Sequence, residues 1–336
     1  MRDFSRLWRA RLTASGFYLG VGVALAMSSS NASAAEDAAK YPSRAIHVVV
    51  GFTPGGGNDI IARIVGQKLS ESLGQPVIIE NKPGAGAILA TEYVAKSAPD
   101  GYTLLIGASG AIVINPAVDA KLPYDPVRDF IPISMLGSFP LILVVNTGSQ
   151  FKSVSDLVTY AKANPDKVNY SSSSAAFQLA TELFKQKTGA PMQMIPYKGA
   201  NDSVVAVIAD EVTATIADSG PVSSQVKGGQ VRALAVTAPR RMADLPTVPT
   251  MKEAGADVDA VLWSGILAPK GTPPEIIRKL QDEFIRIAKI PDVVERLKLL
   301  GIESIGNSSA EFSQVIASDI ARWTEVARAG NIKIER

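Results

Sequence analysis

One stretch, residues 48–63, most constrains what this chain can fold into. It begins with the β-branched run 48–50, which is typical of a strand buried on both faces. A turn with three successive glycines follows at residues 54–57, where the backbone can come close to another group. Apolar residues at helical spacing begin after Asn58 and Asp59, both good N-cap types. A strand, a glycine turn and a helix start leave backbone N–H groups pointing beyond the strand, which favours an anion there.

The first 34 residues are typical of a secretory signal peptide. Four arginines lie within residues 2–11, an apolar core follows at 12–27, and Ala32-Ser33-Ala34 matches a cleavage pattern. The apolar core is shorter than the roughly 20 residues that a membrane-spanning helix needs, which disfavours a transmembrane anchor. We therefore expect cleavage near Ala34, export to the periplasm and no direct membrane insertion.

Composition disfavours several classes of function. Residues 1–34 carry a net charge of +3, so the remaining chain falls from +2 to −1 and has no basic field for nucleic acid. The chain has no Cys, which excludes disulfides, thiolate chemistry and a lipoprotein anchor. Its single His, His47, lies in the first strand, so catalytic triads and His-rich metal sites are disfavoured. Residues 107–111 lack the final Gly of a nucleophile elbow.

Expected strands and helices alternate along the rest of the chain. The expected strands are 46–50, 77–80, 103–107, 141–145, 168–170, 192–196, 213–218, 231–237 and 263–269. The expected helices are 60–73, 87–96, 153–164, 175–188, 201–210, 276–288, 292–300 and 310–329, with a helical turn at 223–227. This alternation predicts βαβ units, and about 300 residues are enough for two lobes. The chain should cross between lobes near 137–146 and 231–263, with a ligand at the carboxyl ends of strands.

Ten motifs match a known family in order along the chain. They are YPS (41–43), FTPGGGND (52–59), ENKPGAG (80–86), APDGYTL (98–104), NP (115–116), LPYDP (122–126), PYKG (196–199), RALAVT (232–237), APKGTP (268–273) and EF (311–312). On these residues the chain resembles the extracytoplasmic receptors of tripartite tricarboxylate transporters, the Bug family of solute-binding proteins. The motifs span essentially the whole chain after the signal peptide, and they are specific for the family but much less so for the ligand.

The resemblance implies an α/β, two-lobed periplasmic-binding-protein fold of the Venus flytrap, type II-like kind, with two parallel-core sheets flanked by helices. Lobe 1 would comprise residues 41–140 and 264–336, and lobe 2 would comprise 141–263. The implied function is capture of a small organic carboxylate, a di- or tricarboxylate, for the permease subunits of a membrane transporter. We expect a monomer that is not an enzyme, needs no cofactor and binds no nucleic acid.

The resemblance places the ligand between two strand-to-helix loops, 52–59 and 171–178. Backbone N–H groups and trapped waters would hold one carboxylate, and neither loop carries Lys or Arg. Ser173 and Ser174 could donate to that carboxylate and also cap a helix. The candidate ligand-binding residues are Phe52, Thr53, Gly55, Gly56, Gly57, Asn58, Asp59, Ser109, Ser173, Ser174, Ala176, Phe177, Tyr197 and Asp218.

Five positions keep a second interpretation. Phe177 lies in a loop that departs from the usual family pattern, and it either faces a ligand with an apolar or aromatic body or packs at the helix start. Asp218 either takes a water or a hydroxyl near the ligand or caps a turn. Trp263 is either a cleft wall or hinge packing. Asn58 and Asp59 fit helix caps better than ligand contacts.

Two other functions fit parts of the chain. The glycine turn and Glu80 resemble the dinucleotide-binding motif of an enzyme, but Ile60 stands where G-x-G-x-x-G needs its last Gly. The sequence also contains no P-loop motif. An exported sensor partner of a membrane kinase would bind the same carboxylate in the same clamshell. The sequence does not separate sensing from transport.

Overall fold

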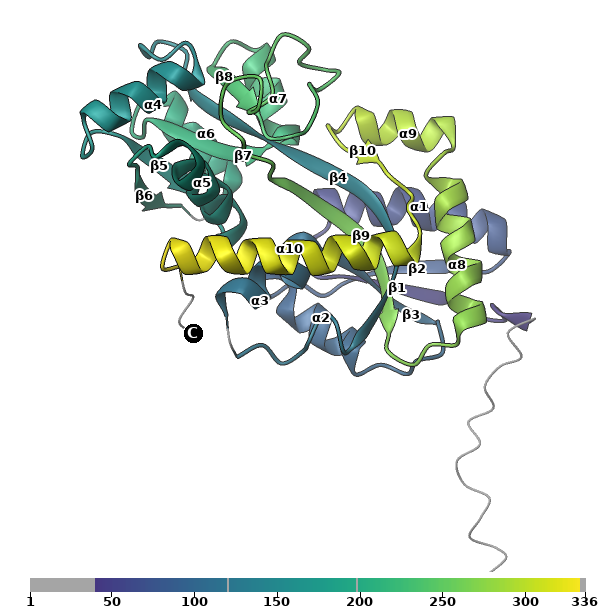
Figure 1. Cartoon of the computed structure of the whole chain (residues 1–336). Coiled ribbons are helices and arrows are strands. Elements are labelled where there is room, and N and C mark those ends of the chain that lie inside the picture. Colours follow the sequence, from purple (N-terminus) through teal and green to yellow (C-terminus); the bar gives the residue numbers. More distant parts are fainter. Residues whose placement is uncertain (1–39, 120, 198, 333–336) are drawn as a thin grey trace, which may run out of the picture. The chain divides into compact units, whose positions relative to one another are not determined.

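The computed structural model describes residues 40–119, 121–197 and 199–332 (Figure 1). The expected signal peptide and its cleavage motif lie outside these residues. Residues 42–336 form a single unit, and the description below concerns that unit alone. Within the described ranges, none of the helices is long and apolar enough to cross a membrane.

The first sheet surrounds the strand that precedes the glycine turn. Its strands are β1 (Ile46–Val50), β2 (Val77–Asn81), β3 (Thr103–Ala108), β4 (Phe130–Asn146), β9 (Val261–Pro269) and β10 (Glu303–Ser304). β1 lies between β2 and β3 and is parallel to both. β9 is antiparallel to β3 and to β4, and β10 pairs with β4. Residues 48–50 are buried, as the β-branched run predicts.

The second sheet has the same kind of parallel core. Its strands are β5 (Asn169–Ser172), β6 (Gln193–Pro196), β7 (Ala214–Asp218) and β8 (Val231–Val236), together with the second half of β4. β5 lies between β6 and β7 and is parallel to both, whereas β4 is antiparallel to β7 and β8. β4 therefore runs through both sheets, as Figure 1 shows.

Helices follow most strands, which gives the expected βα units. They are α1 (Gly57–Leu73), η2 (Ala85–Ala87), α2 (Ile88–Ala95), η3 (Gly110–Ile114), α3 (Asn115–Val118), α4 (Val154–Ala163), α5 (Ala175–Thr188), α6 (Ala200–Ile208), α7 (Ser219–Lys227), α8 (Pro274–Ile287), α9 (Pro291–Lys298) and α10 (Ser309–Ala329). α4 and α10 begin with capping boxes built on Ser153 and Ser308. The α/β class is confirmed, and each parallel core is extended by antiparallel strands.

Three elements differ from the expectation. The strand expected at 141–145 begins at Phe130, because pairing with β9 carries it through two prolines and two irregularities of register. The helical turn expected at 223–227 begins earlier, because residues 219–222 already form the first turn of α7. The helical residues 110–118 were not predicted.

Side chains alternate between two core clusters on the second sheet. Leu141, Leu143 and Ile216 belong to a cluster that also contains residues of α5. Ile142 and Ala217 belong to a second cluster with residues of α6. Neighbouring residues of β4, and likewise of β7, therefore lie on opposite faces of the sheet.

Candidate functional site

Asp59 holds the glycine loop in shape. Its carboxylate accepts hydrogen bonds of 2.9 Å each from Gly55 N–H, Arg63 Nε and Asn81 Nδ2. Asn81 Nδ2 also donates to the carbonyl oxygen of Phe52 at 3.0 Å. Burial alone would raise the pKa of Asp59, but the hydrogen bonds from Arg63, Gly55 and Asn81 together lower it to about 2. With only 2% of its surface exposed, Asp59 supports the loop from within.

The N-terminus of α1 is open. Its N-cap is Gly56, and no side chain of the described residues caps it. The expectation that Asn58 or Asp59 would be the N-cap is wrong, because the helix begins at Gly57. The first-turn N–H groups of Gly56, Gly57 and Asn58 are thus placed to meet an anion. Gly55 instead gives its N–H to Asp59 and has a φ of +87°, a conformation that favours glycine.

β4 lies directly beside this open N-terminus. A Cβ atom added to Gly57 would lie 3.0 Å from Cε1 of Phe139, which is a residue of β4. Phe139 is half-buried, while Thr53 and Gly57 of the loop are exposed. Phe139 was not among the expected site residues.

β9 joins two more of the expected residues. Asn58 Oδ1 accepts a hydrogen bond from the hydroxyl of Ser264. The preceding residue, Trp263, donates its backbone N–H to Ser109 Oγ at 3.2 Å. Asn58 and Ser109 therefore meet adjacent residues of one strand. The indole Nε1 of Trp263 donates to Asp319 at 2.8 Å and only 3% of Trp263 is exposed, which favours hinge packing over a cleft wall.

The second loop lies at the carboxyl edge of the second sheet. Because β5, β6 and β7 are parallel, the residues that follow each strand share one edge. Ser174 is exposed and is the N-cap of α5, where its hydroxyl accepts from Phe177 N–H at 3.5 Å. Ser173 is half-buried. Tyr197 follows β6, and its N–H donates to the carbonyl oxygen of Ser172 at 2.8 Å.

Two expected contact residues of α5 are buried. Ala176 and Phe177 are each 8% exposed and belong to the core cluster of α5. Burial of Phe177 favours its packing interpretation. The hydroxyl of Tyr197 is directed toward Glu211, with 3.3 Å between the two oxygen atoms.

Asp218 ends β7, and its carboxyl accepts no hydrogen bond from the described side chains or backbone N–H groups. It occupies the N-cap position of α7 without making a capping hydrogen bond to any described group. The residue as a whole is half-buried. Loss of hydration raises the pKa of Asp218 to about 6.

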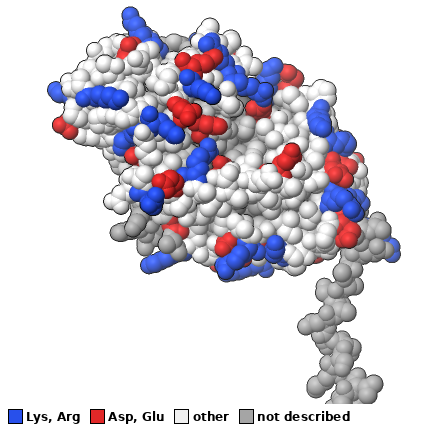
Figure 2. Space-filling model, viewed as in Figure 1, with Lys and Arg blue, Asp and Glu red and all other residues white. Residues whose placement is uncertain are grey.

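The first cation after each loop is engaged by an acidic side chain. Arg63 binds Asp59, and Lys185 binds Glu182 with 2.8 Å between Nζ and Oε2. Figure 2 shows basic and acidic side chains interspersed over one face of the molecule. In the part of the chain that the structure describes, no group of three His, Cys, Asp or Glu residues is placed to hold a metal ion. The positive charge that each loop can offer is therefore the partial charge at the N-terminus of the helix that follows it.

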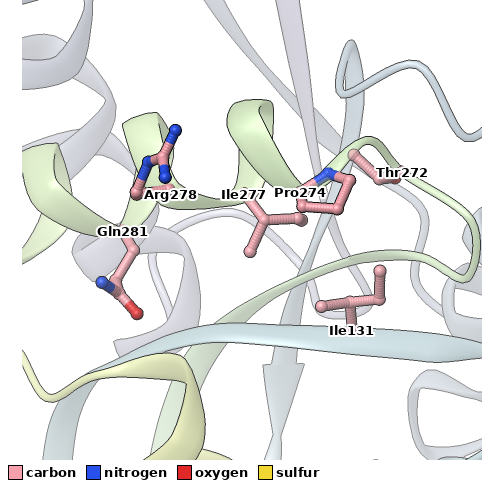
Figure 3. Close-up of a pocket in the computed structure, with 6 residues that line it drawn as sticks. All are labelled: Ile131, Thr272, Pro274, Ile277, Arg278 and Gln281. Carbon is pink, nitrogen blue, oxygen red and sulfur yellow. The ribbon is translucent and has the colours of Figure 1, made fainter.

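A separate hollow of about 410 Å³ lies at the start of α8 (Figure 3). Its walls are Ile131, Thr272, Pro274, Ile277, Arg278 and Gln281, none of which is an expected site residue. The N-cap of α8 is Pro273 and its first residue is Pro274, and both lack the N–H donors that an anion would need. We therefore place the candidate site at the strand ends.

Comparison with known proteins identifies the family. The family model of the tripartite tricarboxylate transporter family receptor matches residues 61–332. Protein BugT of Bordetella pertussis is 37% identical over 299 residues, which cover 88% of this chain and 92% of BugT.

Solved structures of similar proteins share the fold. Rpa4515 of R. palustris with adipate has a TM-score of 0.77 and 34% identity, over 87% of this chain and 99% of that chain. MatC from Rhodopseudomonas palustris with bound malate has a TM-score of 0.73 and 30% identity, over 85% of this chain and 99% of that chain. The expected periplasmic-binding-protein fold is confirmed by these neighbours. The chain therefore belongs to the tripartite tricarboxylate transporter receptor family, the Bug family, whose members are solute-binding receptors and not enzymes.

Proposed function

We propose that this receptor captures a small organic carboxylate in the periplasm and delivers it to the permease subunits of a tripartite tricarboxylate-type transporter. The open N-terminus of α1 carries the proposal, because its uncapped N–H groups lie at a strand end beside a loop without Lys or Arg. Structures of relatives with adipate and with malate support a carboxylate as the ligand. Di- and tricarboxylates, including those with an apolar or aromatic body, are the proposed ligands.

The proposal includes the remaining expectations about the whole chain. Lobe 1 (41–140 and 264–336) and lobe 2 (141–263) would close on the ligand, with loops 52–59 and 171–178 facing it. Cleavage near Ala34 would release a monomer. Asp218 would accept a hydrogen bond from a water or a hydroxyl group of the ligand, since its carboxyl has no partner among the described residues.

A thermal-shift screen tests the proposal. The mature protein is heated with a panel of mono-, di- and tricarboxylates, with ATP and NAD as controls. A true ligand raises the melting temperature according to RT ln(1 + [L]/Kd). We expect at least one carboxylate to do so and neither nucleotide. A shift with a nucleotide and with no carboxylate would refute the proposal.

A further inference from the structure

Phe139 is the residue of β4 that lies beside the open end of α1. Successive residues of a strand alternate between faces, so Gly137, Phe139 and Leu141 lie on one side of β4. A Cβ atom at Gly137 would lie 3.2 Å from Ile61 of α1, which covers that end of the row. Leu141 is fully buried in the core cluster of α5. Phe139, between them, is the member of this row that is only half-buried.

Phe139 and the α1 N-terminus border the same space. The ring edge of Phe139 lies against Gly57, the first residue of α1 and itself exposed. An anion held by the first-turn N–H groups would therefore have the ring beside it. Of the hydroxyls near this space, Ser264 donates its proton to Asn58, and Ser109 accepts from Trp263.

The ring of Phe139 would stabilise some groups next to a bound carboxylate and destabilise others. A CH₂ group would lie against the ring and lose apolar surface to it, which is favourable. A hydroxyl group at the same carbon would lose water against the ring without gaining a hydrogen-bond partner from it, which is costly. Asp218 is the register partner of Leu141, which places its backbone about 7 Å further along β4 than Phe139.

We infer that Phe139 is a specificity-determining residue whose ring favours carboxylates with no hydroxyl group on the carbon next to the carboxyl. The inference rests on the proposed function and adds a ligand class to it. Phe139 would act by forming the apolar wall of the site beside the α1 N-terminus.

Matched acids with and without a hydroxyl beside every carboxyl test the inference. Calorimetry on the mature protein compares succinate with tartrate, adipate with 2,5-dihydroxyadipate, and phenylacetate with mandelate. For each pair that binds, we expect the unsubstituted acid to bind tighter by about tenfold to a hundredfold. The Phe139→Thr variant, which suits a strand, should lose most of this preference, and Phe139→Leu should keep most of it. Tyr93→Ser, at an exposed aromatic residue of α2, is the control and should bind as the native protein does.

The outcomes separate the inference from the proposed function. If unsubstituted and hydroxylated acids bind equally well to the native protein, or the hydroxylated acid binds better, the inference is wrong and carboxylate binding stands. The same holds if Phe139→Thr melts like the native protein and keeps the full preference. If none of the six acids binds while another carboxylate of the thermal-shift panel does, the inference is wrong and carboxylate binding stands. If no carboxylate of that panel binds, both the inference and the proposed carboxylate function are overturned.

Discussion

A carboxylate beside an anion site would ordinarily weaken it, since like charges repel. In this loop the charge of Asp59 is balanced by Arg63 and directed at Gly55 N–H and Asn81, which lie behind the open end of α1. Asp59 also lies in the first turn of α1, where a negative charge interacts favourably with the helix dipole. Its role is to fix the loop that presents the N–H groups.

Asp59 should make stability depend on acid pH. Its pKa is lowered from 3.8 to about 2 in the folded protein, so it stabilises the fold above pH 4, and this stabilisation is lost as pH falls toward 2. The contribution is about 2 kcal/mol. We expect urea unfolding at pH 7 to show Asp59→Asn less stable by about this amount, with the difference shrinking between pH 4 and pH 2. Asp166→Asn, at an exposed position, is the control. Equal unfolding free energies for the native protein and Asp59→Asn at pH 7 would contradict this role.

The sequence predicted that the candidate residues lie at strand ends and helix starts, but it misjudged how some of their side chains act. The residue types of Asn58 and Asp59 suggested helix caps, whereas their side chains bind Ser264 and the loop interior. Phe139 was missed because its neighbour Gly57 is 82 residues earlier in the chain and the stretch around it contains Gly137 and Pro140. No local pattern reports a contact of that separation.

At the scale of elements, the features that the sequence predicted are those that depend on residues close together in the chain. The βα alternation and the capping box at Ser153 were predicted because they depend on periodicity and on residues three apart. The first half of β4 was not predicted, because its prolines disfavour a strand and it forms through pairing with the distant β9. The first turn of α7 was missed as well, because it contains Pro221, and proline occurs both in loops and in the first turn of a helix.

The N-terminal turn of α1 can be closed without disturbing its fold. A Cβ atom at Gly56 meets only Thr53 O, at 3.7 Å, and its φ of −78° suits other residues. Gly56→Val should therefore melt near the native temperature, while its branched side chain covers the first-turn N–H groups and lowers carboxylate affinity by at least about a hundredfold. Calorimetry and thermal melting check both parts. A variant that retains native affinity would remove this loop from the site.

At the scale of the whole unit, the site depends on strands that belong to both sheets. β4 brings Phe139 beside α1 and Leu141 beside Asp218, two residues apart on one strand. β9 is anchored to α10 through Trp263 and Asp319, and α10 also accepts a hydrogen bond from Gln186 of α5 at Val326 O. A ligand between the two loops would thus touch the segments that connect the sheets.

Amide chemical shifts provide the most direct test that a carboxylate binds the N-terminus of α1. The backbone amides of Gly56, Gly57 and Asn58 would be followed by NMR while the tightest-binding carboxylate is titrated. The amide of Asp156, which Ser153 already caps, is the internal control. We predict that the three α1 amides shift and saturate at the calorimetric Kd while the Asp156 amide does not. Saturable binding that leaves the three amides unchanged would contradict the account.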